Sequence, residues 1–286
     1  MRAVIPAGGF GTRMLPATKS MPKEMLPVVD KPTIQYVIEE ARDAGIEDIC
    51  IITGRTKRGI EDHFDKAPEL EHFLEEKGKT AVLEGLQRTR NMGNLIYVRQ
   101  DWPQGLGHAV LQAAPVVEQG PFAVLLGDDI IVGGKPVTRQ LIEAHERTGK
   151  TVIAVQRVPE ADVSKYGVVA IEPGADGLHE VTKIVEKPAV EDAPSNLAVI
   201  GRYVFTPDII AKLRETGIGV GGEIQLTDAI AKQVEEGNVM CLEFEGRRFD
   251  VGAVTGWLEA NVALALEGPN ASEVREILER ELARSK

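Results

Sequence analysis

The chain has 286 residues and a formal net charge of −11 at pH 7, with 43% hydrophobic and 27% charged residues. These values are ordinary for a globular protein, and the length suits one large α/β core with an appendage. The acidic balance argues against non-specific nucleic-acid binding, which requires a basic protein face. Neither a signal-peptide pattern nor a membrane-spanning apolar run is evident, so we expect a cytoplasmic protein without nucleic-acid or membrane partners.

The cysteine content argues against a disulfide-stabilised protein and against a zinc-binding protein. The only two cysteines, Cys50 and Cys241, each lie in an apolar run. Such residues usually behave as small buried hydrophobes. We therefore expect two buried free thiols, and neither a disulfide framework nor a zinc cluster.

The first half of the chain alternates short apolar runs with amphipathic stretches. We predict strands at Ala3–Pro6, Asp48–Thr53, Leu95–Gln100, Phe122–Leu126 and Thr151–Gln156. Helical spacing predicts helices at Thr33–Ala44, Gly107–Val117 and Val137–Thr148. The charged stretch Glu69–Gly78 is expected to be a solvated helix and loop. Strands that alternate with helices predict parallel βαβ units with both sheet faces covered.

After about residue 155 polar loops separate the apolar runs. Further strands are predicted at Gly167–Ile171, Val181–Glu186, Ala198–Phe205 and Val239–Phe249. Further helices are predicted at Glu223–Gln233, Thr255–Leu266 and Ser272–Lys286. This pattern favours a mixed or antiparallel extension of the sheet with its own ligand site. We expect one domain over residues 1–286, divided at about residues 155 and 252.

A glycine-rich loop follows the first predicted strand directly, with the sequence Ala7-Gly8-Gly9-Phe10-Gly11-Thr12-Arg13. Glycines at the carboxyl end of a strand let backbone N–H groups approach a phosphate closely. The loop matches neither the Walker A motif nor the dinucleotide fingerprint. A tight structural turn explains such a loop equally well when it stands alone.

Cations next to the loop favour the phosphate-binding interpretation. Arg13, Lys19 and Lys23 lie within one short stretch that prolines interrupt. Each alone would be explained by a solvated surface charge. Together, beside a glycine loop, they can neutralise a triphosphate and the charge that develops when it reacts.

These motifs carry a family resemblance. The loop residues Ala7-Gly8-Gly9-x-Gly11-Thr12-Arg13 with Pro22-Lys23 resemble the signature of the sugar nucleotidylyltransferases. The stretch Pro22-Lys23-Glu24-Met25-Leu26-Pro27 is similar to the bacterial UTP–glucose-1-phosphate uridylyltransferase branch, and the similarity continues to about residue 252. After Gly252 the chain departs from that branch, which usually continues with an acidic residue and a Lys-Leu-Gly-like stretch. Here the sequence is Ala253-Val254-Thr255-Gly256-Trp257.

The resemblance implies a fold and a reaction. The fold would be Rossmann-like, a mostly parallel or mixed sheet flanked by helices, of the nucleotide-diphospho-sugar transferase type. Residues to about 155 would bind the nucleotide, residues 156–252 the sugar, and residues 253–286 would form C-terminal helices. The reaction would join UTP to glucose 1-phosphate and release pyrophosphate. A homodimer or homotetramer is also implied.

The resemblance also assigns roles to individual residues. Arg13, Lys23 and Lys187 would act in catalysis. The nucleotide would contact Ala7, Gly8, Gly9, Gly11, Thr12, Arg13, Glu24, Gln100 and Gly105, the last two at the base. The sugar phosphate would contact Gly167, Glu186, Lys187 and Val199. A surface ion pair is the alternative for Glu186 and Lys187, and we interpret His108 as a structural residue or a helix N-terminal contact.

Three carboxylates are considered for a magnesium site. Asp128 and Asp129 follow a buried strand, and Asp250 lies in Phe249-Asp250-Val251-Gly252. A phosphate-bound Mg²⁺ needs only one or two protein carboxylates, since phosphate and water supply the remaining oxygens. Turn or helix-cap roles are the alternatives. The resemblance implies that Asp128 and Asp250 hold Mg²⁺.

Neither a Ser-His-Asp nor a Cys-His constellation is evident, and a phosphate nucleophile is already an anion that needs no general base. We therefore expect catalysis by positioning and charge neutralisation. A dTTP-dependent thymidylyltransferase remains an alternative, because thymine differs from uracil by one methyl group. A sugar-nucleotide-dependent glycosyltransferase and a non-catalytic regulatory relative are the others.

Overall fold

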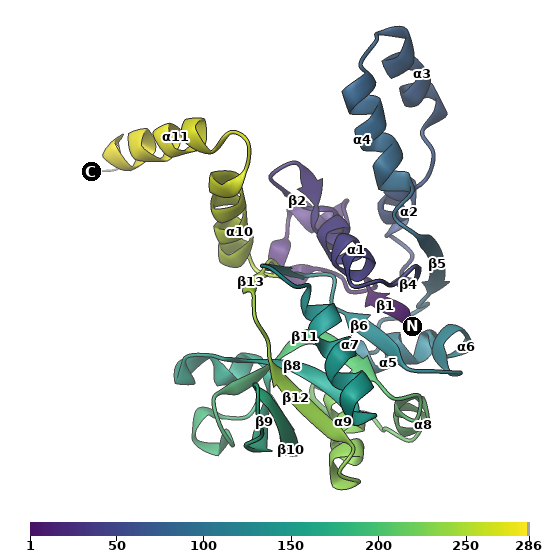
Figure 1. Cartoon of the computed structure of the whole chain (residues 1–286), viewed down its shortest axis with the longest axis vertical. Helices are drawn as coiled ribbons and strands as arrows, with labels where there is room; N and C mark the ends of the chain where they lie inside the picture. Colours follow the sequence, from purple (N-terminus) through teal and green to yellow (C-terminus); the bar gives the residue numbers. More distant parts are fainter. Residues whose placement is uncertain (285–286) are drawn as a thin grey trace.

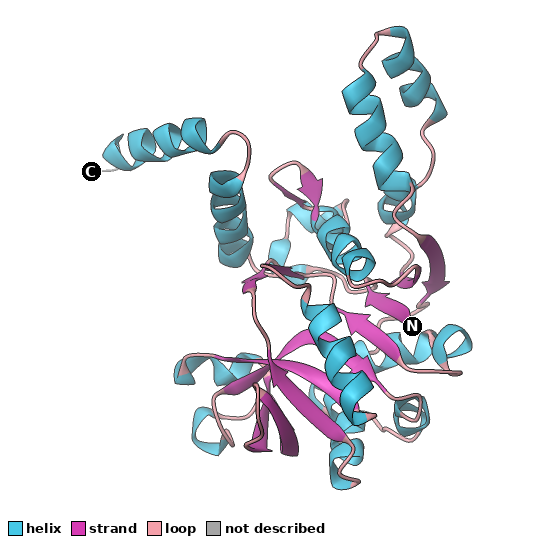
Figure 2. Ribbon diagram, in the orientation of Figure 1, coloured by secondary structure: helices cyan, strands magenta, loops and turns pink. Residues whose placement is uncertain are grey.

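The computed structural model describes residues 1–284, so the last two residues of the predicted helix Ser272–Lys286 lie outside the described part. A nine-stranded sheet with the order β5-β4-β1-β6-β11-β8-β12-β10-β9 forms the centre (Figures 1 and 2). Its strands are β1 Arg2–Pro6, β4 Asp48–Thr53, β5 Asn94–Arg99, β6 Phe122–Leu125, β8 Thr151–Arg157, β9 Gly167–Glu172, β10 Leu178–Glu186, β11 Leu197–Phe205 and β12 Val239–Glu243.

The two halves of the chain share this sheet. Strands β5, β4, β1 and β6 are parallel, as predicted for βαβ units. Strand β11 from the second half lies between β6 and β8 and runs antiparallel to both. The second half therefore does more than extend one edge, because β11 joins the parallel strands to β8, β12, β10 and β9.

Alternate residues of β1 face two separate cores. Ala3 and Ile5 pack in a core with residues of α1 (Thr33–Asp43) and α7 (Val137–Thr148). Val4 packs on the opposite face with residues of α5 (Leu106–Gln112), α8 (Ile209–Arg214) and α9 (Leu226–Glu235). All three β1 residues are fully buried. Helices thus cover both faces, which explains why three consecutive residues of the strand are apolar.

Two helical segments project from the body in Figure 1. One follows α2 (Arg58–Phe64) and contains α3 (Pro68–Glu76) and α4 (Thr80–Arg90), of which only the first was predicted. The other is the C-terminal arm, formed by α10 (Val254–Glu267) and α11 (Ala271–Arg284). None of the helices in residues 1–284 is both long and apolar enough to cross a membrane.

Three predicted elements differ from the structure. The predicted strand Val239–Phe249 is two strands in different sheets, β12 and β13 (Arg247–Asp250), because Gly246 turns the chain with a φ of 150°. The predicted helix Gly107–Val117 is interrupted at Ala113 into α5 and α6 (Ala114–Val117), where a proline sits in the first turn of α6. The predicted helix Glu223–Gln233 begins only at Leu226.

Smaller elements complete the fold. Strand β13 pairs with β7 (Asp129–Val132), which the sequence pattern did not predict. Strands β2 (Pro27–Val28) and β3 (Lys31–Pro32) form a short hairpin. A third small core, which includes Phe249 and Ala260, joins β13 to α10. Both cysteines are buried free thiols, as expected.

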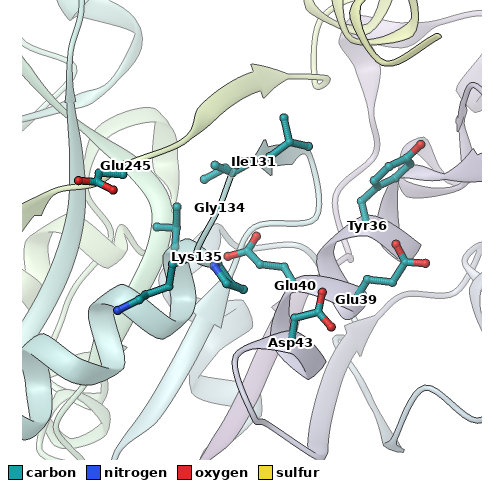
Figure 3. A pocket seen from close by; sticks show the side chains of 12 residues that line it. Tyr36, Glu39, Glu40, Asp43, Ile131, Gly134, Lys135 and Glu245 are labelled. Atoms are coloured by element: carbon teal, nitrogen blue, oxygen red, sulfur yellow. The ribbon is translucent and has the colours of Figure 1, made fainter. Parts of the chain in front are cut away.

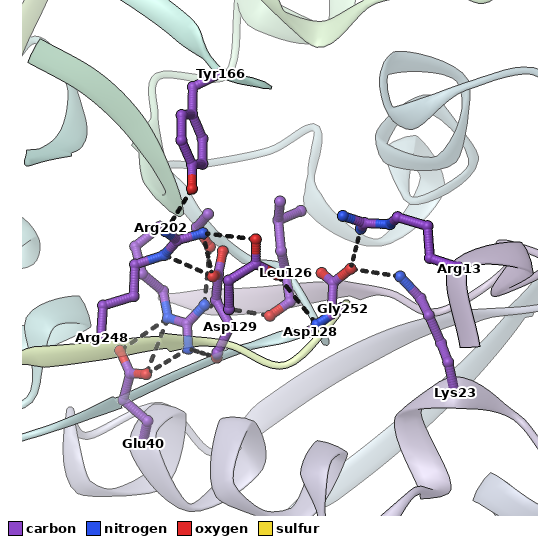
Figure 4. Close-up of polar contacts among 12 residues, drawn as sticks. Arg13, Lys23, Glu40, Leu126, Asp128, Asp129, Tyr166, Arg202, Arg248 and Gly252 are labelled. Atoms are coloured by element: carbon purple, nitrogen blue, oxygen red, sulfur yellow. Dashed lines mark hydrogen bonds and ion pairs between the residues drawn. The ribbon is translucent and has the colours of Figure 1, made fainter. Parts of the chain in front are cut away.

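A buried ion pair connects helix α1 in the first half of the chain to strand β11 in the second half. The Arg202 guanidinium of β11 contacts the Glu40 carboxylate of α1, with the Nη2–Oε2 distance at 2.7 Å. It also donates to the backbone carbonyl oxygens of Leu126, Gly201 and Asp129 (Figure 4). Thr138 adds a 2.6 Å hydrogen bond to Glu40. Every charge in this cluster is paired, which burial requires.

Replacing one partner tests the importance of this pair. We expect Arg202→Leu to destabilise the fold by about 3–5 kcal/mol, because it leaves the buried Glu40 carboxylate without its counter-ion. Urea unfolding followed by circular dichroism measures the loss. Arg58→Leu, which removes the exposed ion pair with Asp62, is the control and should change the stability little. Equal midpoints for the two variants would contradict this role of Arg202.

Candidate active site

Two cavities lie side by side at the carboxyl ends of the central parallel strands. The larger has a volume of about 400 Å³. Its lining includes Pro6 at the end of β1, Gln100 after β5 and Leu126 after β6. The smaller, of about 190 Å³, lies toward β9 and β11. Arg13, Leu106, Leu126 and Asp128 line both. This edge is where open α/β sheets bind their ligands.

The glycine loop forms one wall of the larger cavity. Gly11 adopts a left-handed conformation with φ 66°, and an added Cβ would lie 3.1 Å from the Lys23 Cβ. Thr18 donates a 2.8 Å hydrogen bond to the Gly11 carbonyl, so the loop is held against the segment that carries the cations. At Gly9 an added Cβ would meet nothing within 4 Å, so the backbone there is open to a ligand.

Five further predicted nucleotide residues line this cavity beside Gly9, together with Lys23 from the predicted catalytic set. The five are Gly8, Arg13, Glu24, Gln100 and Gly105. Ala7, Gly11 and Thr12 are not among its lining residues. Ala7 is buried and donates its backbone N–H to Ile52. Ala7 and Gly11 therefore hold the shape of the loop, and Thr12 is exposed outside the cavity lining.

Two of the three loop cations converge on Asp128, and the third, Lys19, is exposed. The Lys23 Nζ lies 2.5 Å from Asp128 Oδ2, and an Arg13 Nη2 lies 3.6 Å from the same oxygen (Figure 4). Burial lowers the pKa of Lys23, but the Asp128 charge and hydrogen bond raise that pKa above its usual value. For Asp128 burial raises the pKa, and the Lys23 charge turns the net direction downward. Both groups are therefore held in their charged forms.

A second lysine neutralises the cavity wall. Lys57 Nζ contacts Glu24 Oε2 at 2.8 Å, and both side chains are almost fully buried. Burial raises the pKa of Glu24 despite this partner and the nearby Lys23. The other carboxylate oxygen, Glu24 Oε1, makes no hydrogen bond within the described residues. Sequence reasoning missed Lys57, since no local pattern signals a partner 33 residues away.

Asp128 and Asp250 face the same point in space. An added Cβ at Gly252 would lie 2.8 Å from Asp128 Oδ2 and 3.2 Å from Asp250 Oδ1. The Val251 N–H donates to the Asp128 carbonyl, and the Gly252 N–H donates to Asp250 Oδ1. Strand pairing of β13 with β7, which sets Asp250 opposite Asp129, explains the convergence.

These carboxylates fit a divalent cation that also binds phosphate. Two hard oxygen donors converge over a residue without a side chain, and Mg²⁺ requires one or two such carboxylates when phosphate and water complete its shell. Within residues 1–284 no group of three or more His, Cys, Asp or Glu side chains suited to a metal is found. The described residues therefore do not form a metal site from protein ligands alone.

Asp129 has a different partner from its neighbour. Arg248 Nη2 lies 2.6 Å from Asp129 Oδ1 and 3.9 Å from Asp250 Oδ2. Arg248 also donates to the Tyr166 hydroxyl at 3.3 Å (Figure 4). Although burial lowers the pKa of Arg248, the Asp129 charge raises it. Sequence reasoning missed Arg248 and Tyr166; the proximity of Arg248 to Asp250 in the sequence was the available signal.

The predicted sugar residues divide into two groups. Gly167, Glu186 and Val199 line the smaller cavity together with Asp250, and Thr227 donates a 2.7 Å hydrogen bond to Glu186. Lys187 is not among its lining residues. The Lys187 side chain is 53% exposed and lies 3.4 Å from Glu186 Oε1, so the surface ion pair considered for these residues is present.

The far end of the larger cavity is built around Gly105. Its φ is 103°, and an added Cβ would lie 2.7 Å from the Glu223 Cβ and 2.8 Å from the Ile224 carbonyl oxygen. Only glycine fits this position. Gln100 is 4% exposed, and its Nε2 lies 2.8 Å from Nδ1 of His108. The two predicted base contacts thus line the same cavity.

A third cavity, of about 220 Å³, lies between α1 and the loop after β7 (Figure 3). Its lining includes the carboxylates of Glu39, Glu40, Asp43 and Glu245 and one lysine, Lys135. None of the predicted site residues lines it. Because most of the charged side chains that line this cavity are negative, it disfavours a polyphosphate. The two cavities at the strand ends are therefore the better candidate site.

Comparison with known proteins supports this assignment. A family model described as nucleotidyl transferase matches residues 2–267. A UTP–glucose-1-phosphate uridylyltransferase of Bacillus subtilis (strain 168) is 53% identical over 266 residues, which are 93% of this chain and 91% of the relative.

Solved structures agree with the sequence relatives. A UTP-bound UGPase from Acinetobacter baumannii superposes with a TM-score of 0.90 at 41% identity, over 97% of this chain and 98% of that one. A UDP-glucose pyrophosphorylase complexed with UDP-glucose gives 0.86 at 42% identity, over 93% and 99%. The predicted fold and the resemblance to bacterial uridylyltransferases are confirmed. The chain belongs to the nucleotidyl transferase family.

Proposed function

We propose that this enzyme transfers the uridylyl group of UTP to glucose 1-phosphate and releases pyrophosphate. The observation that carries the proposal is the shared wall of the two cavities, where Arg13 and Asp128 lie between the nucleotide residues and the sugar residues. A phosphate oxygen of the sugar attacks the α-phosphorus of UTP, and the bond to the β-phosphate breaks. The names of the relatives and the UTP-bound structure support this choice of substrates.

The larger cavity has the chemistry for the nucleotide. Open backbone at Gly9 would receive the phosphates, with Arg13 and Lys23 as counter-ions. Glu24, Gln100 and Gly105 would contact the nucleoside. Once the substrates are bound, these cations would stand beside the phosphates and stabilise the departing pyrophosphate. Ala7 and Gly11 would hold the shape of the loop, and the exposed Thr12 completes the proposed nucleotide half of the site.

The smaller cavity would hold the sugar phosphate. Glu186, fixed by Thr227, offers an acceptor to sugar hydroxyls, and Gly167 leaves room for the ring. Val199 supplies an apolar wall. Lys187 would orient the phosphate after its side chain leaves Glu186, a short movement for an exposed lysine.

Asp128 and Asp250 would hold Mg²⁺ between the two substrates. When bound, the ion would neutralise phosphate charge at the reacting centre. For Asp128 to act as a ligand, Lys23 must move from its present 2.5 Å contact toward the phosphates. The expected homodimer or homotetramer and the expected cytoplasmic location stay predictions.

A substrate matrix tests the proposed reaction. UTP, dTTP, CTP, ATP and GTP are each combined with several sugar 1-phosphates, with and without Mg²⁺, and pyrophosphate release is measured. We expect Mg²⁺-dependent release that needs both substrates and is fastest with UTP and glucose 1-phosphate. Fastest release with dTTP would identify a thymidylyltransferase, and free nucleoside diphosphate in its place would indicate a glycosyltransferase. No release from the folded protein would favour a non-catalytic relative.

Removing the Lys23 charge tests its role. We expect Lys23→Met to lower kcat on the order of 10²–10³-fold, the usual cost of one preorganised electrostatic contact at the reacting centre. Steady-state pyrophosphate release measures it. Lys31→Met is the matched control, because it removes an equally short 2.5 Å ion pair, with Glu39, outside both cavities. Similar losses in the two variants would refute a catalytic role for Lys23.

The open backbone at Gly9 gives a test of phosphate binding. Gly9→Ala should leave the melting temperature of the free protein unchanged, since the added methyl group meets nothing within 4 Å. It should weaken UTP binding by about tenfold or more, because the methyl group stands where phosphate would approach. Thermal shift with and without UTP measures both effects. Undiminished stabilisation by UTP would show that phosphate does not bind at Gly9.

A further inference from the structure

Three aspartates line the smaller cavity, but only two of them converge on one point. The three are Asp128, Asp129 and Asp250. The atoms nearest to an added Cβ on Gly252 are an Nη2 of Arg13, Asp128 Oδ2 and Asp250 Oδ1. Asp129 contributes none of them, although it follows Asp128 in the sequence and lies opposite Asp250 in the pairing of β7 with β13. The proposed metal site therefore omits a carboxylate that adjoins both of its ligands.

Arg248 holds the omitted carboxylate (Figure 4). Its Nε and Nη2 lie 2.7 Å and 2.6 Å from Asp129 Oδ1, and the two side chains are 11% and 6% exposed. Asp129 Oδ2 lies 2.6 Å from the position of an added Cβ on Gly201. Arg248 Nη1 donates a 3.3 Å hydrogen bond to the Tyr166 hydroxyl, and the Tyr166 ring centre lies 5.3 Å from the guanidinium carbon. Asp129 is thus bound to a guanidinium that Tyr166 also holds in place.

The contact between Arg248 and Asp250 is longer. Arg248 Nη2 lies 3.9 Å from Asp250 Oδ2, which is beyond hydrogen-bond length. Asp250 Oδ1 instead accepts a hydrogen bond from the backbone N–H of Gly252 at 3.1 Å. One guanidinium therefore binds Asp129 closely and leaves Asp250 at the point that it shares with Asp128.

The number of carboxylates at this point decides how a divalent cation can bind. Mg²⁺ held by one or two protein carboxylates relies on phosphate and water for the rest of its shell. The affinity of a protein for such hard cations depends on the charge count of its ligands. A third carboxylate would let the protein bind a cation without a nucleotide. With Asp129 bound to Arg248, residues 1–284 contain no group of three such side chains suited to a metal.

We propose that Arg248 is a positioning residue that holds Asp129 away from the proposed metal site, so that a divalent cation binds there only together with phosphate. The inference rests on the metal site of the proposed function and names the residue that sets its ligand number. Arg248 touches no reacting atom in this role, because it acts through Asp129. In this arrangement the affinity of the protein for the cation depends on the nucleotide.

Two variants separate the guanidinium from the carboxylate that it holds. Arg248→Met keeps an unbranched side chain but releases Asp129. Arg248→Met/Asp129→Asn removes both charges, so it leaves no unpaired carboxylate. Arg247→Met is the matched control, because it removes the same charge from the next residue of β13. The Arg247 side chain is 53% exposed and contacts Glu259 at 3.4 Å, outside both cavities.

The test is a titration with Mn²⁺ in the absence of nucleotide and sugar phosphate, in which electron paramagnetic resonance measures the unbound ion. Mn²⁺ favours the same carboxylate and water ligands as Mg²⁺. We expect Arg248→Met to bind Mn²⁺ about tenfold or more tightly than the wild-type protein, because the released Asp129 adds a charged ligand. Arg247→Met and the double variant should bind Mn²⁺ as weakly as the wild-type protein. Circular dichroism checks that each variant is folded.

Three outcomes would overturn the role of Arg248. The first is an Arg248→Met variant that binds Mn²⁺ no more tightly than Arg247→Met. The second is a double variant that binds as tightly as Arg248→Met, since the gain would then not come from Asp129. If Arg248→Met does not fold, Asp129→Asn decides: it should leave Mn²⁺ binding in the presence of UTP unchanged. Weaker binding by Asp129→Asn, the third outcome, would show that Asp129 already acts as a ligand.

The same measurements separate this inference from the proposed function. Normal Mg²⁺-dependent pyrophosphate release by the wild-type protein, without any gain of Mn²⁺ binding in Arg248→Met, would refute the inference alone. Tight Mn²⁺ binding that appears in Arg248→Met and disappears in the double variant, from a protein that releases no pyrophosphate, would refute the proposed function and support the role of Arg248.

Discussion

The guanidinium of Arg202 is the group on which the geometry of the site depends. It is fully buried in β11, the strand that connects the two halves of the sheet, and it binds Glu40 and the carbonyls of Leu126 and Asp129. Those carbonyls flank Asp128. The loop that carries Asp128 is therefore held by the Arg202 guanidinium, which Glu40 of α1 holds in turn. Because the pair is buried and saturated, loss of either partner would leave an uncompensated charge beneath the reacting centre.

Beside the Arg202 cluster, positive and negative side chains of the site form ion pairs. Lys57 pairs with Glu24, Lys23 with Asp128, and Arg248 with Asp129. Such an arrangement lets a chain with a net charge of −11 keep several cations ready for a polyphosphate. Local placement of charge, rather than the overall balance, determines what this protein can bind.

The sequence predicted the parts of the fold that depend on local pattern. The glycine loop after β1, the strand that ends before Asp128 and helix α7 over Val137–Thr148 agree with prediction because periodicity and glycine positions are local signals. Pairing partners are not local. The insertion of β11 between β6 and β8, and the division of the apolar run 239–249 between two sheets, depend on contacts between distant segments.

The candidate site shows the same division. The glycines and carboxylates could be predicted because a family pattern places them at strand ends. Lys57 could not, since its partner Glu24 lies 33 residues away and no local pattern marks it. Tyr166 precedes the predicted Gly167, but its contact with Arg248 joins residues 82 positions apart. The position of Lys187 outside the smaller cavity reflects its positive φ of 44° and its contact with Glu186, neither of which composition or spacing reveals.

The stretch that departs from the family pattern gives the C-terminal arm a mechanical property. Helix α10 begins four residues after Asp250, and Gly256 in its first turn packs directly on the Asp250 carbonyl, where an added side chain would overlap it. Trp257 donates its indole N–H to Pro27, near the loop cations. The arm is thus anchored on the backbone of the residue proposed to hold the metal. A force applied to α11 would reach that residue through the full 14-residue length of α10, so one continuous helix joins the outer end of the arm to the reacting centre.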